Sequence, residues 1–128
     1  MKQLNTIQKI ERLNDIFALD EPAGPGGACH LFQVCKHNTG RISEEDGTFR
    51  TRPENMLLTV QMQCGAVPGV TDADLLEIVR DRFRAGMFKP GRPREYTPAL
   101  IHVEEALMWL NRLAEKQATR GVLGTEQD

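Results

Sequence analysis

The hydrophobic period of the chain changes near residue 70, and this change limits the possible folds more than any other feature of the sequence. Before it, Leu58, Val60 and Met62 alternate with polar residues, a pattern typical of a half-buried strand. After it, apolar residues recur at helical spacing in two segments, which predicts two helices. Strands followed by helices favour an α+β fold, with a small antiparallel β-sheet in the N-terminal half and a C-terminal two-helix hairpin.

Local signals divide the N-terminal half further. Ile7, Ile10 and Leu13 are spaced by about one helical turn, which predicts a helix over residues 5–17. Residues 29–36 are rich in strand formers, and the polar segment 41–54 is expected to form a hairpin loop. A chain of 128 residues is expected to be one domain. Its expected parts are an N-terminal helical extension over 1–20, a β-sheet region over 28–64, a helix hairpin over 71–121 and a tail over 122–128.

Capping signals set the expected ends of the two helices. Thr71 with Asp74 resembles a capping box, and Gly86 is expected to end the first helix in the left-handed conformation. Thr97 is expected to cap the second helix, with Pro98 at its first position. Its apolar stripe consists of Leu100, Val103, Leu107 and Leu110.

Charge and composition exclude several classes of protein. The pI near 5.9 argues against binding to duplex nucleic acid. The longest apolar run is Ala106 to Leu110, so no segment is expected to cross a membrane. The N-terminus is polar, which argues against a secretory signal. The three cysteines are then expected to be free thiols in a reducing compartment, the cytoplasm.

Positive charge is concentrated between the two expected helices. Residues 80–94 contain six basic residues and one acid, although the whole chain has a net charge of −2. Aromatic rings can stack on a base while guanidinium groups bind phosphates, so this segment is a candidate nucleotide site. The alternative is a structured loop whose rings fill the core and whose arginines face water. The candidate ligand-binding residues are Phe83, Arg84, Phe88, Arg92, Arg94 and Tyr96.

Other clusters carry weaker signals. Arg112, Lys116 and Arg120 form a basic stripe at the end of the second helix, a candidate second anionic site that also complements the helix dipole. Cys29, His30, Cys35 and His37 have poor spacing for tetrahedral zinc. No nucleophile–base set is identifiable, so we expect no enzyme activity, no metal and no cofactor.

Five segments together resemble the phage-encoded Thoeris anti-defence proteins. They are residues 24–32 (GPGGACHLF), 69–83, 83–88 (FRAGMF), 104–110 (EEALMWL) and 120–125 (RGVLGT). The resemblance implies an α+β protein that forms homo-oligomers and sequesters a cyclic ADP-ribose-type nucleotide without degrading it. The bacterial immune effector in the host cytoplasm is then deprived of its signal. Some relatives also hold cyclic oligonucleotides at a separate site.

The chain departs from this family at several positions. Relatives carry arginines where Leu113 and Gln117 stand, whereas the basic residues here are Arg112 and Lys116. Glu95-Tyr96 replaces a Glu-Asn step before the last helix. An alternative function is a homo-oligomeric protein-interaction module of phage or prophage origin without a nucleotide ligand, in which Met108 and Trp109 form a contact patch.

Overall fold

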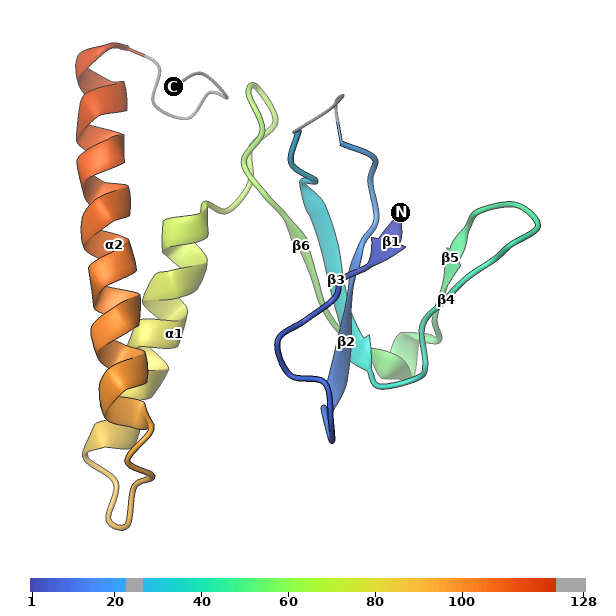
Figure 1. Ribbon diagram of the computed structural model, residues 1–128. Coiled ribbons are helices and arrows are strands. Elements are labelled where there is room, and N and C mark those ends of the chain that lie inside the picture. Colours follow the sequence, from blue (N-terminus) through green and yellow to red (C-terminus); the bar gives the residue numbers. More distant parts are fainter. Residues whose placement is uncertain (23–26, 122–128) are drawn as a thin grey trace. The chain divides into compact units, whose positions relative to one another are not determined.

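The computed structural model describes residues 1–22 and 27–121. The chain divides into two compact units, Met1–Met62 and Gln63–Asp128, where the sequence predicts one domain. The first unit contains the strands and the second contains the two helices (Figure 1). The expected tail 122–128, the first part of the 24–32 motif and the end of the 120–125 motif lie outside the described residues.

A four-stranded antiparallel sheet forms the first unit, in the order β1-β2-β3-β6. This sheet and the later helices confirm the predicted α+β fold. β3 pairs with Ile16 of β2 through Val34 on one side and with Leu58 of β6 on the other. The strands are β1 (Lys2–Gln3), β2 (Asn14–Ala18), β3 (Leu31–Lys36) and β6 (Met56–Gln61).

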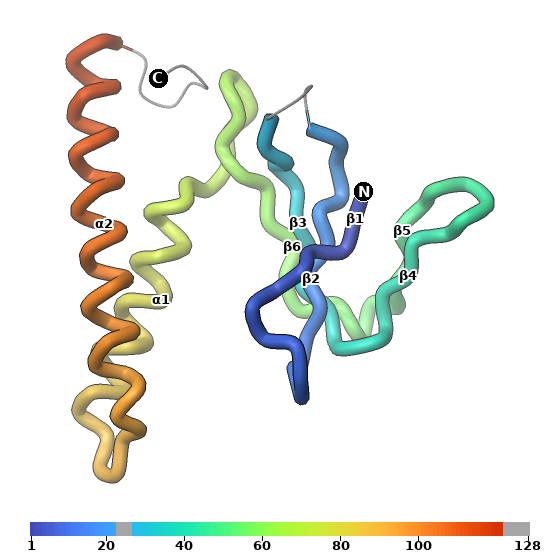
Figure 2. Tube along the Cα trace, in the orientation of Figure 1, coloured from blue at the N-terminus to red at the C-terminus, as the bar shows by residue number. Residues whose placement is uncertain are grey.

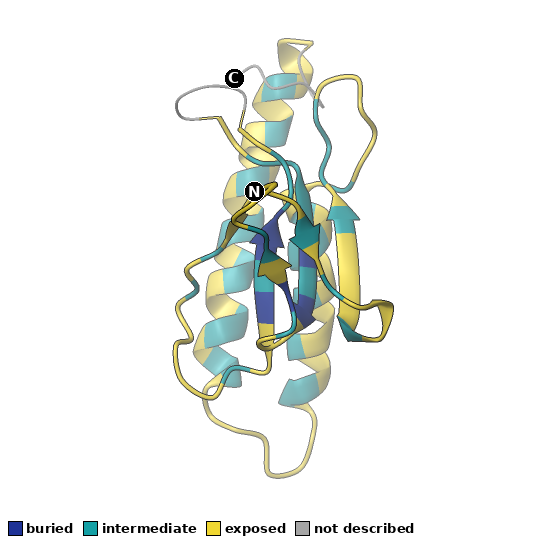
Figure 3. Cartoon of the chain, turned by 90° about the vertical axis from the view of Figure 1, so that its right-hand side faces the viewer, coloured by how far each residue is buried: buried dark blue, intermediate teal, exposed yellow. Residues whose placement is uncertain are grey.

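A short hairpin between β3 and β6 completes the core of this unit. It consists of β4 (Arg41–Ile42) and β5 (Phe49–Arg50), and a 3-10 turn, η1 (Pro53–Asn55), leads into β6. The Phe49 ring packs against Phe17 of β2 with centroids 4.7 Å apart. A Cβ on Gly40 would meet the Phe17 ring at 2.7 Å and Cys35 Sγ at 3.0 Å, so only glycine fits there. Figure 3 shows the buried residues gathered on the sheet.

The helix predicted over residues 5–17, and with it the helical extension over 1–20, is wrong. Residues 14–18 are strand β2, and a loop that Figure 2 traces connects β1 to β2. Glu11 has φ 54°, which a right-handed helix does not allow. Ile7 is 100% exposed, so the apolar spacing that suggested a helix gains nothing from packing. The pairing of Phe17 with Gln33 in β3 decides the conformation instead.

Two helices form the second unit, α1 (Asp72–Met87) and α2 (Tyr96–Thr119). They pack against each other and confirm the predicted hairpin. Thr71 Oγ1 accepts from the Asp74 N–H at 3.1 Å, and an Asp74 carboxylate oxygen accepts from the Thr71 N–H at 2.9 Å, which confirms the capping box. Within the described part of the chain, neither helix is long and apolar enough to cross a membrane.

Two other predicted helix ends, at Gly86 and Thr97, are wrong. Gly86 lies inside α1, which continues to Met87 and has Phe88 as its C-cap residue. α2 begins one residue before Thr97, with Glu95 as N-cap residue and no capping hydrogen bond from its side chain. The Thr97 hydroxyl instead contacts groups of the preceding loop. Pro98 therefore stands at the third helical position, where its missing N–H is still tolerated.

Candidate functional site

The six predicted ligand residues lie together at the closed end of the helix hairpin, and we call them the hairpin-end cluster. Phe83 and Arg84 belong to α1, Phe88 follows it, Arg92 and Arg94 lie in the connecting loop, and Tyr96 opens α2. Because α1 and α2 run in opposite directions, the loop brings residues from both helices to one end. The local sequence thus produces the predicted grouping.

Two aromatic residues of the cluster pack on each other. The Phe83 and Tyr96 rings meet edge to face, with centroids 5.8 Å apart and planes at 66°. A Cβ on Gly86 would stand 3.2 Å from the Tyr96 ring, so the glycine allows the close approach of α1 to this tyrosine. Both rings are half-buried. They fix the loop and leave only part of their surface for a ligand.

Arg92 is held at the same end by contacts that the sequence did not predict. Its Nη1 donates to Thr97 Oγ1 at 2.9 Å and lies 3.1 Å from Met87 Sδ. These contacts link the loop to the ends of both helices. Thr97 stands five residues after Arg92, a spacing that is compatible with this contact. Its position directly before Pro98 predicts a helix cap instead.

The remaining members of the cluster face solvent. The Phe88 side chain is 83% exposed, and the Arg94 side chain is 96% exposed and 4.0 Å from a Glu95 oxygen. Arg84 is also exposed. One exposed ring and two exposed guanidinium groups can therefore be reached by an anionic, aromatic ligand.

One group of the basic segment, Arg80, is already engaged by two acidic side chains. Arg80 Nε donates to Glu104 at 2.8 Å, and its Nη1 lies 3.5 Å from Glu77. The hydrogen bond from Arg80 to Glu104 raises the pKa of the guanidinium above its usual value. This pair links α1 to α2, so Arg80 has a structural role.

The backbone N–H groups at the start of α2 are also engaged. The Tyr96 N–H donates to the Pro93 carbonyl at 3.2 Å, and the Thr97 N–H donates to the Arg94 carbonyl at 3.3 Å. Pro98 has no N–H, and the Ala99 N–H donates to the Glu95 carbonyl. These backbone groups are therefore not free to donate to a phosphate.

The basic stripe of α2 lines a cavity of about 630 Å³. Arg112 stacks near Trp109, its guanidinium carbon 5.7 Å from the ring centroid, while Lys116 and Arg120 are exposed. The described part of the lining carries three basic groups and one acid, so it favours anions. The lining residues are Arg112, Leu113, Glu115, Lys116, Gln117, Thr119 and Arg120.

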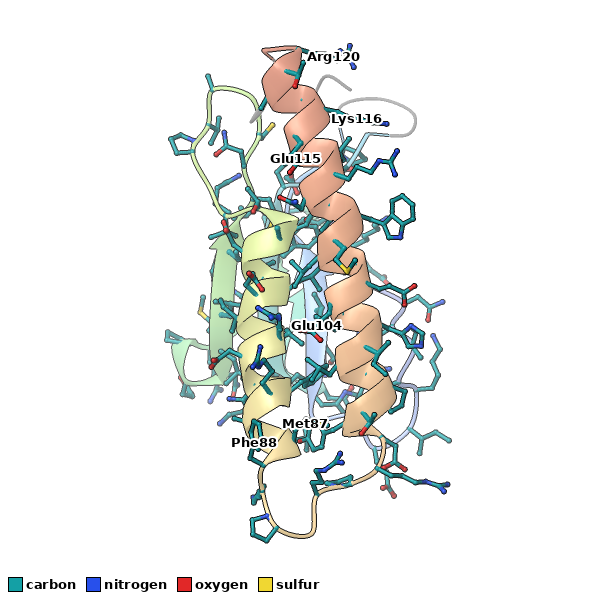
Figure 4. All side chains as sticks on the ribbon, turned by 90° about the vertical axis from the view of Figure 1, so that its left-hand side faces the viewer. Met87, Phe88, Glu104, Glu115, Lys116 and Arg120 are labelled. Atoms are coloured by element: carbon teal, nitrogen blue, oxygen red, sulfur yellow. The ribbon has the colours of Figure 1, made fainter. Side chains whose placement is uncertain are left out.

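The hairpin-end cluster and the α2 cavity are separate sites. Figure 4 shows Met87 and Phe88 at the closed end of the hairpin and Lys116 and Arg120 toward the other end of α2. α2 has 24 residues, which gives a length of roughly 36 Å at the usual helical rise. A single small nucleotide does not reach both groups.

A third polar cluster lies in the first unit around the buried Asp15. Its carboxylate accepts hydrogen bonds from Arg12 Nε at 2.8 Å and the Asn38 N–H at 2.9 Å, and His37 Nδ1 lies 2.9 Å away. Burial raises the pKa of Asp15, but these hydrogen bonds outweigh burial and lower it from 3.8 to about 2. The cluster ties the start of β2 to the segment that follows β3.

The cysteines and histidines are dispersed. Cys35 is buried, whereas Cys29 Sγ lies 3.5 Å from the Asp20 carbonyl oxygen and His37 contacts Asp15. Within residues 1–22 and 27–121, no three His, Cys, Asp or Glu side chains are grouped to hold a metal ion.

Comparison with known proteins gives one informative match. No family model matches the chain. Over 76 residues, the chain is 37% identical to Thoeris anti-defense 1 of Bacillus phage SBSphiJ7, which covers 56% of this chain. The chain spans about half the length of this curated relative, with 54% of the relative matched. The resemblance to the Thoeris anti-defence family that the sequence motifs indicate is therefore confirmed over this part of the chain.

Proposed function

We propose that the protein is a phage anti-defence protein that binds a cyclic ADP-ribose-type nucleotide and sequesters it. The similarity to Thoeris anti-defense 1 is the observation that carries this proposal. Sequestration in the host cytoplasm would deprive a bacterial immune effector of its signal. The ligand is a small dianion with an adenine base, so its site needs cationic groups beside an exposed ring.

The hairpin-end cluster meets this requirement. Arg84 and Arg94 are exposed and can each pair with a phosphate oxygen, and the exposed Phe88 ring offers a stacking surface. Phe83, Tyr96 and Arg92 hold the loop in place and contribute their exposed edges. The loop is positioned by contacts on both helices, which reduces the entropy lost on binding.

The second site in this proposal is the cavity at the end of α2. Three basic side chains gather at it, which fits a larger polyanion such as a cyclic oligonucleotide. Leu113 and Gln117 also line it, at the two positions where the family's arginines are replaced. Arg112, Lys116 and Arg120 supply the positive charge instead.

The proposal includes release of the ligand intact, since binding requires no chemical step. Purified protein is titrated by calorimetry with cyclic ADP-ribose isomers and with UMP as a nucleotide that lacks the adenine base. The protein is then denatured and the nucleotide is analysed by chromatography. Saturable binding with full recovery of the unmodified isomer supports sequestration, whereas a hydrolysed product would identify an enzyme.

Substitutions locate the site. Arg94→Ala and Phe88→Ala should each weaken binding, by about 1.5–3 kcal/mol for a lost charged hydrogen bond and about 1–3 kcal/mol for lost stacking. Arg52→Ala is the matched control, because Arg52 is 82% exposed and lies in the other unit. Unchanged binding by both folded variants would place the site away from the hairpin end.

A protein-interaction module remains the second candidate, and the burial pattern favours it. Neither α1 nor α2 contains a buried residue among those described, although both carry apolar stripes. On α2, Met108 is 70% exposed and Trp109 is 65% exposed. We propose that a second copy of the chain covers this face of α2, because exposed apolar patches of this kind are typical interfaces.

A further inference from the structure

The charge of Arg92 is held differently from that of Arg94, its neighbour in the same loop. Arg92 Nη1 donates to Thr97 Oγ1 at 2.9 Å and to Met87 Sδ at 3.1 Å. Both acceptors are neutral, so they orient the guanidinium without neutralising it. The Arg94 side chain, in contrast, is 96% exposed and lies 4.0 Å from a carboxylate oxygen of Glu95. Arg92 therefore combines a fixed position with an uncompensated charge.

The backbone on both sides of Arg92 is also restricted. Pro90 and Gly91 occupy the central positions of a turn in which the Arg92 N–H donates to the Lys89 carbonyl at 3.2 Å. The proline followed by a glycine with φ 70° is typical of a type II turn. Pro93 comes next and disfavours a helical backbone at Arg92. The side chain thus extends from a backbone that has little freedom left to lose when a ligand binds.

These contacts leave one edge of the Arg92 guanidinium available. Thr97 and Met87 engage the two hydrogens of Nη1, out of the five N–H donors of an arginine side chain. Among the residues that the structure describes, no acceptor meets Arg92 Nε or Nη2, and this residue is exposed. Nε and Nη2 lie in one plane and can donate together to two oxygens of one phosphate. We call them the free edge of Arg92.

Thr97 and Met87 are well placed to keep the free edge in one orientation. Met87 is the last residue of α1, at the closed end of the hairpin (Figure 4), and Thr97 lies in the first turn of α2. Thr97 Oγ1 is 3.7 Å from Met87 Sδ, so the hydroxyl hydrogen can point to the sulfur while the oxygen accepts from Arg92. Both side chains are half-buried. The guanidinium is thus anchored on the ends of two helices and not only on its own loop.

We propose that the free edge of Arg92 binds one phosphate of a diphosphate through both donors, and that Thr97 and Met87 are its positioning residues. This inference rests on the proposed binding of a cyclic ADP-ribose-type nucleotide, which carries the diphosphate. Arg84 and Arg94 then add positive charge from side chains that no helix end holds. Because Arg92 is oriented before the ligand arrives, it loses less side-chain entropy on binding than they do.

Lysine substitutions separate the paired donors of Arg92 from its charge. Arg92→Lys keeps the charge but offers no planar pair of donors. It should weaken the binding of a cyclic ADP-ribose isomer and of inorganic pyrophosphate by at least about tenfold, the loss expected for one charged hydrogen bond. Arg94→Lys is the matched control and should change either affinity far less, because a lysine can replace an exposed arginine that acts as a point charge. Calorimetric titration measures both variants.

The positioning role predicts an effect that a purely structural role does not. Thr97→Val removes the acceptor at nearly the same volume and should weaken pyrophosphate binding, whereas Thr97→Ser keeps the hydroxyl and should restore it. In the Arg92→Lys background, Thr97→Val should cause no further loss of affinity, because the group that Thr97 positions is already absent. Equal losses from Thr97→Val in both backgrounds would overturn the positioning role.

The two probes distinguish this inference from the proposed function. Wild-type affinity of Arg92→Lys for both probes, in protein with native circular dichroism, would overturn the role of the free edge and leave nucleotide sequestration standing. Pyrophosphate binding that depends on Arg92, in a protein that binds no cyclic ADP-ribose isomer, would support the free edge and overturn the proposed nucleotide. Failure of the wild type to bind either probe would overturn both.

Discussion

Asp15 determines how the first unit responds to pH. Its folded-state pKa of about 2 lies below the usual 3.8, so the unfolded chain binds the proton more tightly. The stabilisation is complete above the unfolded-state pKa and is lost as the pH falls from about 4 through 2. The difference in pKa corresponds to about 2 kcal/mol.

Asp15→Asn should therefore flatten the pH dependence of stability between about pH 4 and 2. Because Trp109 lies in the second unit, its fluorescence does not report on the sheet. Amide hydrogen exchange of residues 14–36 at each pH measures the stability of this unit directly. Glu44→Gln is the control, because Glu44 is exposed in the hairpin of β4 and β5, where solvent screens its charge. The same slope in Asp15→Asn and the wild type would contradict this role.

Gly86 and Tyr96 should be energetically coupled. Alanine is favoured over glycine inside a helix by about 1 kcal/mol, but a Cβ at position 86 approaches the Tyr96 ring. In the wild type, Gly86→Ala should gain less than this amount or be destabilising. In the Tyr96→Ala background, where the ring is absent, it should be stabilising by about 1 kcal/mol. Urea unfolding of the four proteins, followed by Trp109 fluorescence, gives the coupling energy. Additive effects would show that the two residues do not interact.

For the helices, the capping box of α1 should contribute more to stability than Thr97, the residue predicted to cap α2. Thr71→Ala removes the hydrogen bond to the Asp74 N–H and should destabilise the helix hairpin by about 1 kcal/mol. Thr97→Ala should cost less, because Thr97 is not the N-cap residue and its hydroxyl contacts the side chains of Arg92 and Met87 instead of a backbone N–H. Trp109 fluorescence during urea unfolding measures both variants. A larger loss for Thr97→Ala would indicate that the Arg92 contact dominates.

The spacing of apolar residues predicted an element correctly where the packing of that element follows the same spacing. Leu58 and Val60 alternate with polar residues in both sequence and strand β6, and the capping box lies within four consecutive residues. The helix predicted around Ile7 does not form, because the pairing of β2 with β3 overrides the helical spacing of the apolar residues. Long-range pairing is not readable from spacing alone.

For the candidate site, the sequence predicted which residues lie together but not which of them are engaged by other side chains. The six residues of the hairpin-end cluster could be grouped from the sequence, because the loop is short and both flanking helices have clear apolar spacing. The sequence did not show that Arg80 pairs with Glu104, which is 24 residues away on the other helix. Nor did it show that the first turn of α2 donates to its own loop. Which charges are available to a ligand depends on these tertiary contacts.

For the whole molecule, the separation of the two candidate sites predicts independent binding. Arg94→Ala should weaken cyclic ADP-ribose-type binding and leave cyclic oligonucleotide binding unchanged. The paired substitution Lys116→Ala with Arg120→Ala should do the opposite, because these residues lie toward the other end of α2 (Figure 4). Calorimetric titrations of each variant with both ligand classes measure the effect. Loss of both activities in either folded variant would show that the sites are coupled.

The proposed self-contact on α2 determines the expected assembly. Met108 and Trp109 are exposed on α2 in the second unit. One self-complementary interface on a chain builds a dimer. Light scattering of the wild type should therefore give a mass of about twice the 14.4 kDa of one chain.

A charge on this face of α2 should separate the two copies. Trp109→Glu places a carboxylate among apolar side chains of the contact and should reduce the dimer to a monomer. Leu13→Lys is the matched control, because this leucine is 83% exposed in a loop of the other unit. A monomeric wild type at micromolar concentration, or a dimeric Trp109→Glu variant with native circular dichroism, would contradict the interface.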